Sequence, residues 1–366
     1  MRILIATGIY PPDIGGPAQY ARGVEKAWKK EGHTVKVLAF RLERKLPTGI
    51  RHLYYFFRVL FSISRADFVF SPDTFSAAIP ALLASKLCGK KIILRTGGDF
   101  LWEQFVERTG DLVLLNNFYD NTNTFGLEAS VFPRQSSSTT TKTKVRKGTR
   151  HVRLNIKERT IFKLLRFLFR YADAIIFSTK WQRDIFKETY QLDLNRCFIV
   201  ENYYGPRVSN SMLQHTIAKK IFVGGTRELK WKNLPRVEEA FAKVQKKGLP
   251  VSLELQTGSH GQFLADIQAS YAVILASLGD ISPNTILEAI QYGKPFILTR
   301  ETGLYEKLKD IGVWVNPEDV NDIAAKIEWL ADEKNYEEQC KKVAAFTFEH
   351  SYDDISREIL TCYQEL

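Results

Sequence analysis

The chain has 366 residues, of which 45% are apolar and 25% are charged. These fractions are typical of a folded globular protein and exclude a disordered chain, and the length favours two domains because it exceeds the usual growth of one core. No run of about 18 uncharged apolar residues and no secretory start occur, so we expect a cytoplasmic protein.

Cysteine spacing and charge distribution further limit the kinds of site and partner that the protein could have. The four cysteines are scattered and form no C-x-x-C pair, so the sequence predicts neither a zinc site nor a disulfide framework. The formal net charge of +11 comes from one segment, because residues 134–170 hold twelve Lys or Arg and one acid. Such a block suits either a solvated loop and helix or an anionic membrane surface. Nucleic acid is the weaker interpretation, since no recognition module accompanies the charge.

Short apolar runs alternate with amphipathic stretches along the first half of the chain. The runs expected to form strands are RILIAT at 2–7, TVKVLAF at 34–40, ADFVFS at 66–71, KIILRT at 91–96, ADAIIFS at 172–178 and CFIVEN at 197–202. Helical patterns lie between them, for example at 17–31 and 74–88. This alternation is typical of a parallel sheet wrapped by helices.

The same alternation restarts after residues 203–218, which are rich in Gly, Pro, Ser and Asn and read as an interdomain linker. Further strands are expected at 219–225, 251–256, 272–277, 295–299 and 312–316. We therefore predict an α/β chain of two open, Rossmann-like parallel-sheet domains, residues 1–202 and 219–351, facing across a cleft.

One segment departs from this pattern. Residues 117–156 show neither the period of a strand nor that of a helix, and we expect a long, mobile insertion there. A basic helical pattern resumes at residue 156, with Ile161, Leu164, Leu165 and Leu168 on one face. Its amphipathic face, like that of residues 51–64, suits either core packing or a membrane surface.

The first motif with chemical content is a glycine pair after the first strand. Gly15 and Gly16 precede a helix opened by Pro17, a residue suited to the first helical position. Paired glycines let a ligand approach the backbone, and the N–H groups of the following turn can hold an anion. The pattern is not G-x-G-x-x-G, so dinucleotide binding is not favoured. A turn that needs positive φ would also select glycine.

Two cations follow the strand expected at 219–225. Arg227 and Lys232 lie five positions apart in the loop before a helix that is expected to begin near Leu234. At the carboxyl end of a strand they suit a diphosphate, with Arg binding as a fork and Lys as a point charge. Taken alone, they also fit a pair of exposed loop cations.

A helix start follows the strand at 272–277. Ser282 is predicted to be its N-cap and Pro283 its first residue, while Gly293 is expected to end the helix. The free N–H groups near Asn284 and Thr285 would then form an anion site.

Two acids flank this helix start. Asp280 lies on the preceding loop and Glu288 follows eight positions later. Because Glu288 is one turn beyond Asn284 and helical side chains lean toward the N-terminus, we expect its carboxylate to point back toward the anion site. Carboxylates beside a phosphate site would accept hydrogen bonds from sugar hydroxyls. This explains two acids in an apolar run where the sequence offers no evident protein partner.

The order of these motifs resembles the retaining GT-B glycosyltransferases of the group 1 family, also called glycosyltransferase family four. The resemblance rests on the glycine-pair loop, on Arg-x-x-x-x-Lys with its WKN, and on the acid-x7-Glu segment that continues into GKPFILT and ETGLYE. It covers nearly the whole chain apart from the insertion. It implies a GT-B fold in which residues 219–351 bind a nucleotide sugar and a final helix, within residues 352–366, crosses back to complete the N-terminal acceptor domain.

The resemblance also implies residue roles. Arg227 and Lys232 would neutralise the leaving diphosphate, Glu288 would hold the ribose hydroxyls, and Asp280 would contact the donor sugar. Gly16 would lie against the diphosphate or the acceptor.

This chain departs from the family pattern at two places. The family usually has Glu where Asp280 stands here. Many members have a His after the strand that corresponds to 91–96, whereas this chain offers Asp99, Trp102 and Glu103. Asp99 is therefore the candidate for the sugar-facing position, with a salt-bridged structural aspartate as the alternative.

The resemblance implies sugar transfer from a nucleotide-diphosphate sugar to a hydroxyl of a glycan or lipid-linked acceptor, as in cell envelope polysaccharide, with retained anomeric configuration. The departing phosphate oxygen would take the acceptor proton, so the protein would act by position and charge. We expect no cofactor and no metal, because no His/Cys/Asp cluster has ligand spacing and the two cations can replace Mg²⁺. Peripheral contact with the inner face of the cell membrane stays open. The alternative is a non-catalytic nucleotide-sugar-binding or scaffold protein of the same fold, and no nucleic acid partner is expected.

Overall fold

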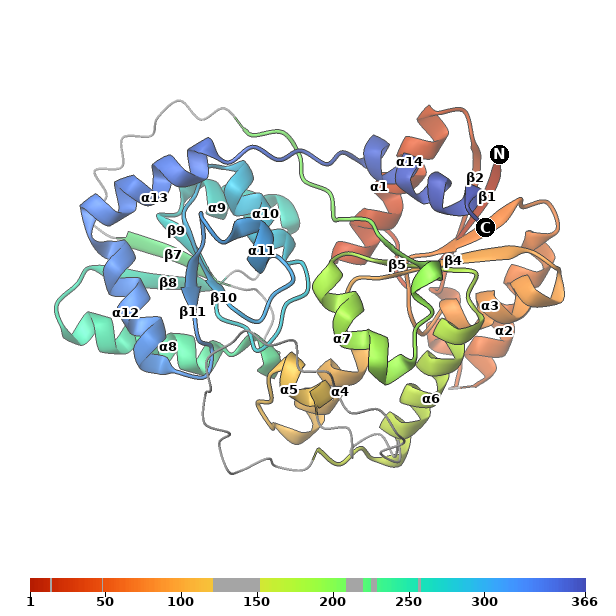
Figure 1. Ribbon diagram of the computed structural model, residues 1–366, viewed down its shortest axis with the longest axis horizontal. Coiled ribbons are helices and arrows are strands. Elements are labelled where there is room, and N and C mark those ends of the chain that lie inside the picture. The colour runs from red at the N-terminus through yellow and green to blue at the C-terminus, as the bar shows by residue number, and fades with distance from the viewer. Residues whose placement is uncertain (14, 48, 121–151, 209–219, 225–228, 256–257) are drawn as a thin grey trace.

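The computed structural model describes the chain except residues 14, 48, 121–151, 209–219, 225–228 and 256–257. Two lobes lie side by side, with the first half of the chain in one and most of the second half in the other (Figure 1). Most of the predicted insertion and most of the predicted linker lie outside the described residues. At the edges of the insertion, helix α5 spans Leu115–Asp120, and Val152 and Leu154 are buried in the first core.

The first lobe is built on a parallel sheet of six strands in the order β2-β1-β3-β4-β5-β6. The strands are β1 (Arg2–Thr7), β2 (Thr34–Ala39), β3 (Phe68–Ser71), β4 (Lys91–Thr96), β5 (Ala174–Phe177) and β6 (Cys197–Ile199). Each lies inside a run that the sequence predicts to be a strand. Every residue of β3 and β5 is buried, as expected where helices cover both faces of a parallel sheet.

Helices cover both faces of this sheet. On one face, α1 (Gly16–Lys30) sets Trp28 edge-on against Phe68 and Phe70, with ring centroids 6.1 and 5.5 Å apart. The other face carries α2 (Ile50–Ile63), α3 (Ala78–Leu87), α6 (Ile156–Tyr171) and α7 (Lys180–Tyr190), with the short turns η1 (Leu42–Lys45) and η3 (Leu194–Arg196) near their ends. Helix α4 (Phe100–Thr109) and α5 lie between the lobes (Figure 1).

The second lobe repeats the plan on a parallel sheet of five strands in the order β11-β10-β9-β7-β8. The strands are β7 (Lys220–Gly224), β8 (Val251–Leu255), β9 (Ala272–Leu275), β10 (Phe296–Thr299) and β11 (Val313–Val315), again inside the predicted runs. One core lies under α8 (Leu234–Lys246) and α12 (Val320–Ala331). The other lies under α9 (His260–Ala269), α10 (Asn284–Gln291), α11 (Tyr305–Leu308) and α13 (Glu333–Ala345).

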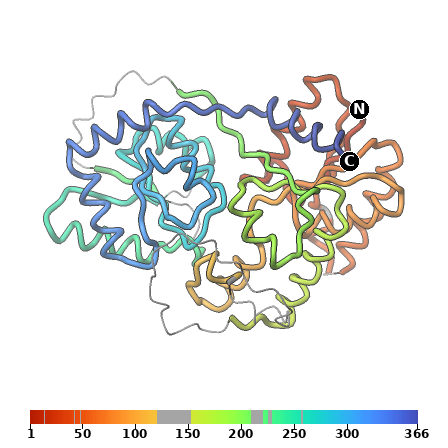
Figure 2. The backbone as a smooth tube through the Cα atoms, in the orientation of Figure 1, coloured from red at the N-terminus to blue at the C-terminus, as the bar shows by residue number. Residues whose placement is uncertain are grey.

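Two segments join the lobes, and the tube in Figure 2 shows them running side by side. Tyr204, after β6, pairs with His350 in an antiparallel β-bridge. The chain then enters α14 (Tyr352–Gln364), which packs on α1 of the first lobe, where Trp28 Nε1 donates to the Ser356 carbonyl at 3.2 Å. The predicted fold class, an α/β chain with two open parallel sheets, is confirmed.

Candidate active site

An ion pair joins the second and third sequence motifs. Lys232 ends the short turn η4 (Lys230–Lys232) after β7, and its Nζ lies 2.7 Å from Oδ2 of Asp280. The two side chains are only 17% and 14% exposed. The Asp280 N–H donates to the Glu301 carbonyl at 2.9 Å, so the backbone of its loop is fixed. The acid that had no evident partner in the sequence therefore has one, 48 residues away along the chain.

Helix α10 begins one residue later than predicted. Its first residue is Asn284, and Pro283 is the N-cap, so Ser282 does not cap the helix. The reason lies in Pro283, whose ψ of 109° is extended, while its carbonyl accepts the first helical hydrogen bond from Ile286 at 3.1 Å. The end is as predicted, because Gly293 follows the helix with a left-handed φ of 68°.

The start of α10 is tied to the first domain by a side chain that sequence reasoning missed. Asn202 Nδ2 lies 3.1 Å from each of three acceptors, the Ser282 carbonyl, Ser282 Oγ and Asn284 Oδ1. Its own Oδ1 accepts from the guanidinium of Arg95, which is buried at the end of β4 and lies 3.8 Å from the ring centroid of Tyr20. The sequence offered one clue to this contact: Arg95 is a charged residue inside an otherwise apolar strand.

The glycine pair meets the same helix start. Gly15 is the N-cap of α1 with a φ of 148°, and Gly16 is the first helical residue. A Cβ on Gly16 would lie 3.2 Å from Asn284 Nδ2, so the first and third motifs approach each other across the domain boundary. Thr285 is half-buried in the first turn of α10.

Glu288 lies one turn into α10 with a side chain that is 18% exposed. Burial raises the pKa of this carboxyl to about 7. Nε2 of His260, the first residue of α9, lies 3.5 Å from its Oε1, and burial lowers the pKa of that imidazole. His260 is a second residue that the sequence reasoning did not select.

The first domain contributes two more acids at this boundary. Asp99 is 3% exposed and caps α4 by accepting from the Trp102 N–H at 3.0 Å, and burial raises its pKa to about 6. Burial, and then the charge of Asp99, raise the pKa of Glu103 to about 7. The charge of Lys232 lowers that pKa and the charge of Asp280 raises it, so Glu103 lies within electrostatic reach of the ion pair.

Helices α4 and α5 hold the ion-pair loop in place. Gly279 is required there, because a Cβ would lie 2.6 Å from Leu115 Cβ and 3.1 Å from the Trp102 ring. The Leu115 N–H donates to the Leu278 carbonyl at 3.1 Å, and the rings of Trp102 and Trp231 lie 5.7 Å apart. The site is thus bounded by both domains.

One residue of the predicted site, Arg227, lies outside the described residues. Within the described ranges, no group of three His, Cys, Asp or Glu side chains could hold a metal ion. In that same part of the chain, no helix combines the length and apolar character needed to span a bilayer.

The two parallel-sheet lobes have the GT-B fold. Residues 256–333, which include Asp280, α10 and Glu288, match the family model described as glycosyl transferases group 1. The resemblance to group 1 glycosyltransferases is therefore confirmed for this segment of the second domain.

Solved structures share the architecture over the whole chain. HepE from Anabaena in complex with UDP is 14% identical with a TM-score of 0.63, covering 100% of both chains. Sucrose-phosphate synthase from Thermosynechococcus elongatus is 12% identical with a TM-score of 0.66, covering 100% of this chain and 98% of the other. The lipopolysaccharide outer core galactosyltransferase WaaB, in its apo form, is 12% identical with a TM-score of 0.59 and full coverage of both chains. No curated protein sequence matches the chain.

Proposed function

We propose that the protein is a glycosyltransferase that moves a sugar from a nucleotide-diphosphate sugar to a hydroxyl acceptor. The observation that carries the proposal is the buried Lys232–Asp280 ion pair beside the start of α10, inside the segment that matches the group 1 family model. HepE, whose fold this chain shares, was solved with UDP and also with UDP and glucose, which supports a nucleotide-sugar donor.

The donor diphosphate is assigned to Lys232, Arg227 and the start of α10. A diphosphate offers Lys232 more negative charge than Asp280 does, so it competes for the ammonium group. The N–H groups of Asn284 and Thr285 lie at a helix N-terminus, where an anion is stabilised by the helix dipole, and Ser282 adds a hydroxyl. Gly16, with Gly15 before it, lies on the opposite side of the same place, where an added Cβ would come within 3.2 Å of Asn284 Nδ2.

The donor's hydroxyl groups are assigned to three acids. Glu288 would accept from the ribose, because its half-buried carboxyl lies one turn behind the diphosphate position. Asp280, released from Lys232, would accept from the transferred sugar. Asp99 would act indirectly: its carboxylate caps α4, and it would thereby position the loop that faces the transferred sugar.

The reaction is proposed to retain the anomeric configuration and to need no metal. The departing phosphate oxygen would take the proton of the attacking hydroxyl on the same face of the sugar. Lys232 and Arg227 would stabilise the charge that develops on the diphosphate, which is how fixed charges accelerate such a step. The acceptor is a glycan or a lipid-linked glycan, and the likeness to a lipopolysaccharide galactosyltransferase fold supports cell envelope polysaccharide.

Turnover of a donor panel tests the proposal. UDP-glucose, UDP-galactose, GDP-mannose and ADP-glucose are incubated with the protein and p-nitrophenyl glycosides, with and without EDTA. Proton NMR of the new anomeric centre is expected to show the donor's configuration, in the presence of EDTA as well. Tight nucleotide binding without turnover of any donor would favour the alternative, a non-catalytic nucleotide-sugar-binding or scaffold protein.

A specific observation favours peripheral contact with an anionic membrane. Phe61 on α2 is 80% exposed, Leu53 is 57% exposed, and Leu87 on the neighbouring α3 is 69% exposed. Helix α6, which packs on α3, exposes Lys163 and Arg170. Apolar and basic side chains on adjoining helices suit a surface of anionic lipid. Flotation with phosphatidylglycerol vesicles at low salt is expected to carry the protein upward, and a protein that stays at the bottom would refute this contact.

A further inference from the structure

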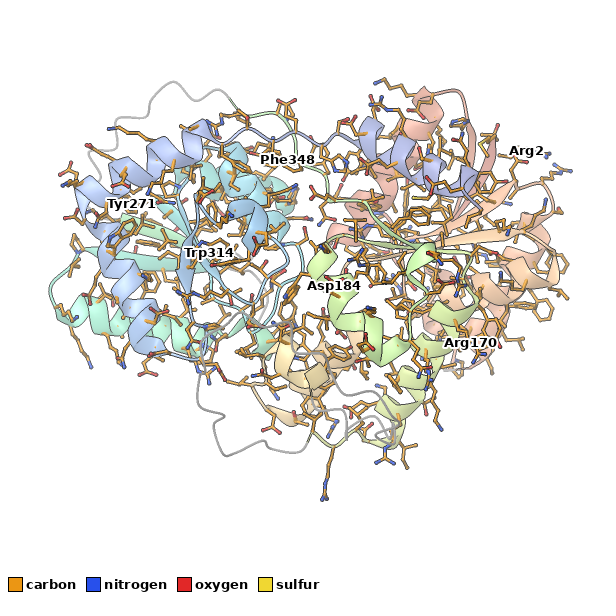
Figure 3. All side chains as sticks on the ribbon, viewed as in Figure 1. Arg2, Arg170, Asp184, Tyr271, Trp314 and Phe348 are labelled. Carbon is orange, nitrogen blue, oxygen red and sulfur yellow. The ribbon has the colours of Figure 1, made fainter. Side chains whose placement is uncertain are left out.

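A pocket of about 290 Å³ lies in the first domain between α5 and α7. This volume is near the lower end of small-molecule sites, roughly 300 Å³, and suits a single sugar ring. Its lining includes Asn116 and Tyr119 from α5 and Trp181, Asp184 and Glu188 from α7. None of these residues belongs to the motifs that predicted the donor site. Figure 3 places Asp184 on α7 near the middle of the molecule.

Helical geometry aligns the α7 side of this pocket. Trp181, Asp184 and Glu188 are three and four residues apart, so their side chains lie on one face of the helix. The helix is held firmly at its start, because Thr179 caps it by accepting from the Gln182 N–H at 3.2 Å. Gln182 is buried and its Nε2 donates to Thr96 Oγ1 at 3.1 Å, which ties α7 to the end of β4.

The chemistry of the lining selects a neutral ligand rich in hydroxyl groups. Trp181 and Ile185 offer apolar area against which the C–H groups of a sugar ring can pack. The carboxylates of Asp184 and Glu188, with side chains 50% and 79% exposed, accept hydrogen bonds, and the Asn116 amide donates and accepts. Asp184 is paired with its neighbour Arg183 at 2.7 Å and Glu188 with Lys187 at 3.6 Å. Among the described residues the lining itself holds no Lys or Arg to bind a phosphate, so this pocket differs in kind from the site at Lys232.

The pocket adjoins the loops that hold Asp280. Asn116 Nδ2 donates to Glu301 Oε2 at 2.9 Å, and the carbonyl of the same Glu301 accepts from the Asp280 N–H at 2.9 Å. At the start of α7, a Cβ on Gly303 would lie 2.3 Å from Thr179 Oγ1, so the two domains are in close contact there. The pocket is therefore connected through Glu301 to the loop that holds Asp280, the residue assigned to the transferred sugar.

We propose that the pocket between α5 and α7 binds a neutral saccharide ring of the acceptor, with Trp181 packing against the ring and Asp184 accepting from its hydroxyl groups. The inference rests on the proposed function, which it deepens by assigning one saccharide ring of the acceptor to this pocket and by naming α7 as its binding element. Trp181 and Asp184 are binding residues and take no part in the chemical step.

Saturation-transfer NMR on the full chain tests the inference, with p-nitrophenyl β-glucoside, β-galactoside and α-mannoside as probes and UDP present. The wild type is expected to give a ring-proton signal for at least one glycoside. Asp184→Asn is expected to weaken binding of that glycoside about tenfold and Trp181→Ala more strongly, with UDP affinity unchanged. Matched controls are Asp310→Asn and Trp329→Ala, which alter an exposed acid and a partly exposed tryptophan of the second domain.

Two outcomes would overturn the inference: no glycoside signal in the wild type, or the same signal in wild type, Asp184→Asn and Trp181→Ala. Circular dichroism checks that each variant is folded. If Trp181→Ala does not fold, Asp184→Asn still tests the inference. Failure of the proposed function looks different: no donor of the panel would be turned over, while the glycoside signal would still be present in wild type and reduced in the two variants.

Discussion

The two domains differ in how deeply their acidic side chains are buried where they meet. The donor wall, made of Lys232, Asp280 and the start of α10, carries a buried ion pair whose side chains are 17% and 14% exposed. The acceptor pocket between α5 and α7 carries Asp184 and Glu188, which are 50% and 79% exposed. Burial strengthens charge interactions, so the donor wall suits a tightly held anion and the acceptor pocket suits a neutral group that is bound and exchanged.

This contrast ranks the effects of substitution. A change on the donor wall removes a charge from a site with little water, whereas a change in the acceptor pocket removes a hydrogen bond that water partly replaces. Substitutions on the donor wall should therefore reduce turnover more than substitutions in the acceptor pocket. A substitution in the acceptor pocket with the larger effect would contradict this difference between the two regions.

Lys232→Ala is expected to have the largest effect. It removes the described cation assigned to the diphosphate and leaves Asp280 buried without its partner. Loss of one group that stabilises developing charge typically lowers turnover roughly 10²- to 10³-fold. The measurement is the initial rate of donor turnover, and Lys246→Ala, an exposed cation at the end of α8, is the matched control. Equal rates for both variants would show that Lys232 does not bind the donor diphosphate.

Glu288→Gln is expected to weaken donor binding and to remove a pH-dependent penalty on stability. In the folded protein burial raises the pKa of Glu288 to about 7, so the folded state binds this proton more tightly than the unfolded chain. The resulting penalty is absent below the ordinary pKa of 4.5 and grows as the pH rises toward 7. It reaches up to about 3 kcal/mol, since a tenfold change in proton affinity corresponds to roughly 1.4 kcal/mol.

Urea unfolding of both proteins at pH 5 and pH 8 measures this penalty. Relative to wild type, Glu288→Gln should be more stable at pH 8 than at pH 5, while its KM for the donor rises roughly tenfold or more through loss of charged hydrogen bonds to the ribose. A stability difference that does not change with pH would mean that Glu288 is not the group carrying the penalty.

Gly279→Ala tests the contact between the donor wall and α5. The added Cβ would lie 2.6 Å from Leu115 Cβ, so one of the two segments must move. Overpacking of this kind typically costs about 1 to 3 kcal/mol, which thermal unfolding would detect. Gly261→Ala is the control, because its Cβ would meet only the Ser259 hydroxyl at 4.0 Å. Two variants of equal stability would show that the domains do not depend on this contact.

The smallest effect on turnover is expected from Leu53→Ser combined with Phe61→Ser. Both side chains are exposed on α2 and belong to neither the donor wall nor the acceptor pocket. Turnover of soluble donor and glycoside should stay at the wild-type rate, while vesicle flotation falls. A comparable loss of soluble turnover would place α2 in the catalytic machinery instead of at the membrane.

The fold could be predicted from the sequence because its strands are short, continuous apolar runs. Buried parallel strands need such runs on both faces, and the helical patterns between them fix the connections. The residues assigned to the proposed donor site could be selected from the sequence for a related reason, since Lys232, Asp280 and Glu288 lie in local segments with a strand before and a helix after. The start of α10 differed by one residue because the extended ψ of Pro283 made it the N-cap.

Long-range contacts were beyond the sequence. The partner of Asp280 lies 48 residues away and depends on how β7 and β9 pair. Arg95 and Asn202 act together only because β4 and the segment after β6 meet at the start of α10. The acceptor pocket needs α5, whose last residues fall in a segment that showed no period.

Calorimetric titration of UDP into wild type, Lys232→Ala and Asp184→Asn tests the central claim most directly. Lys232→Ala is predicted to weaken UDP binding by roughly 100-fold, because it truncates one partner of a buried charge pair. Asp184→Asn is predicted to leave UDP binding unchanged, because Asp184 lies in a separate pocket assigned to a neutral saccharide. Equal UDP affinity in wild type and Lys232→Ala, or an equal loss in both variants, would contradict that claim.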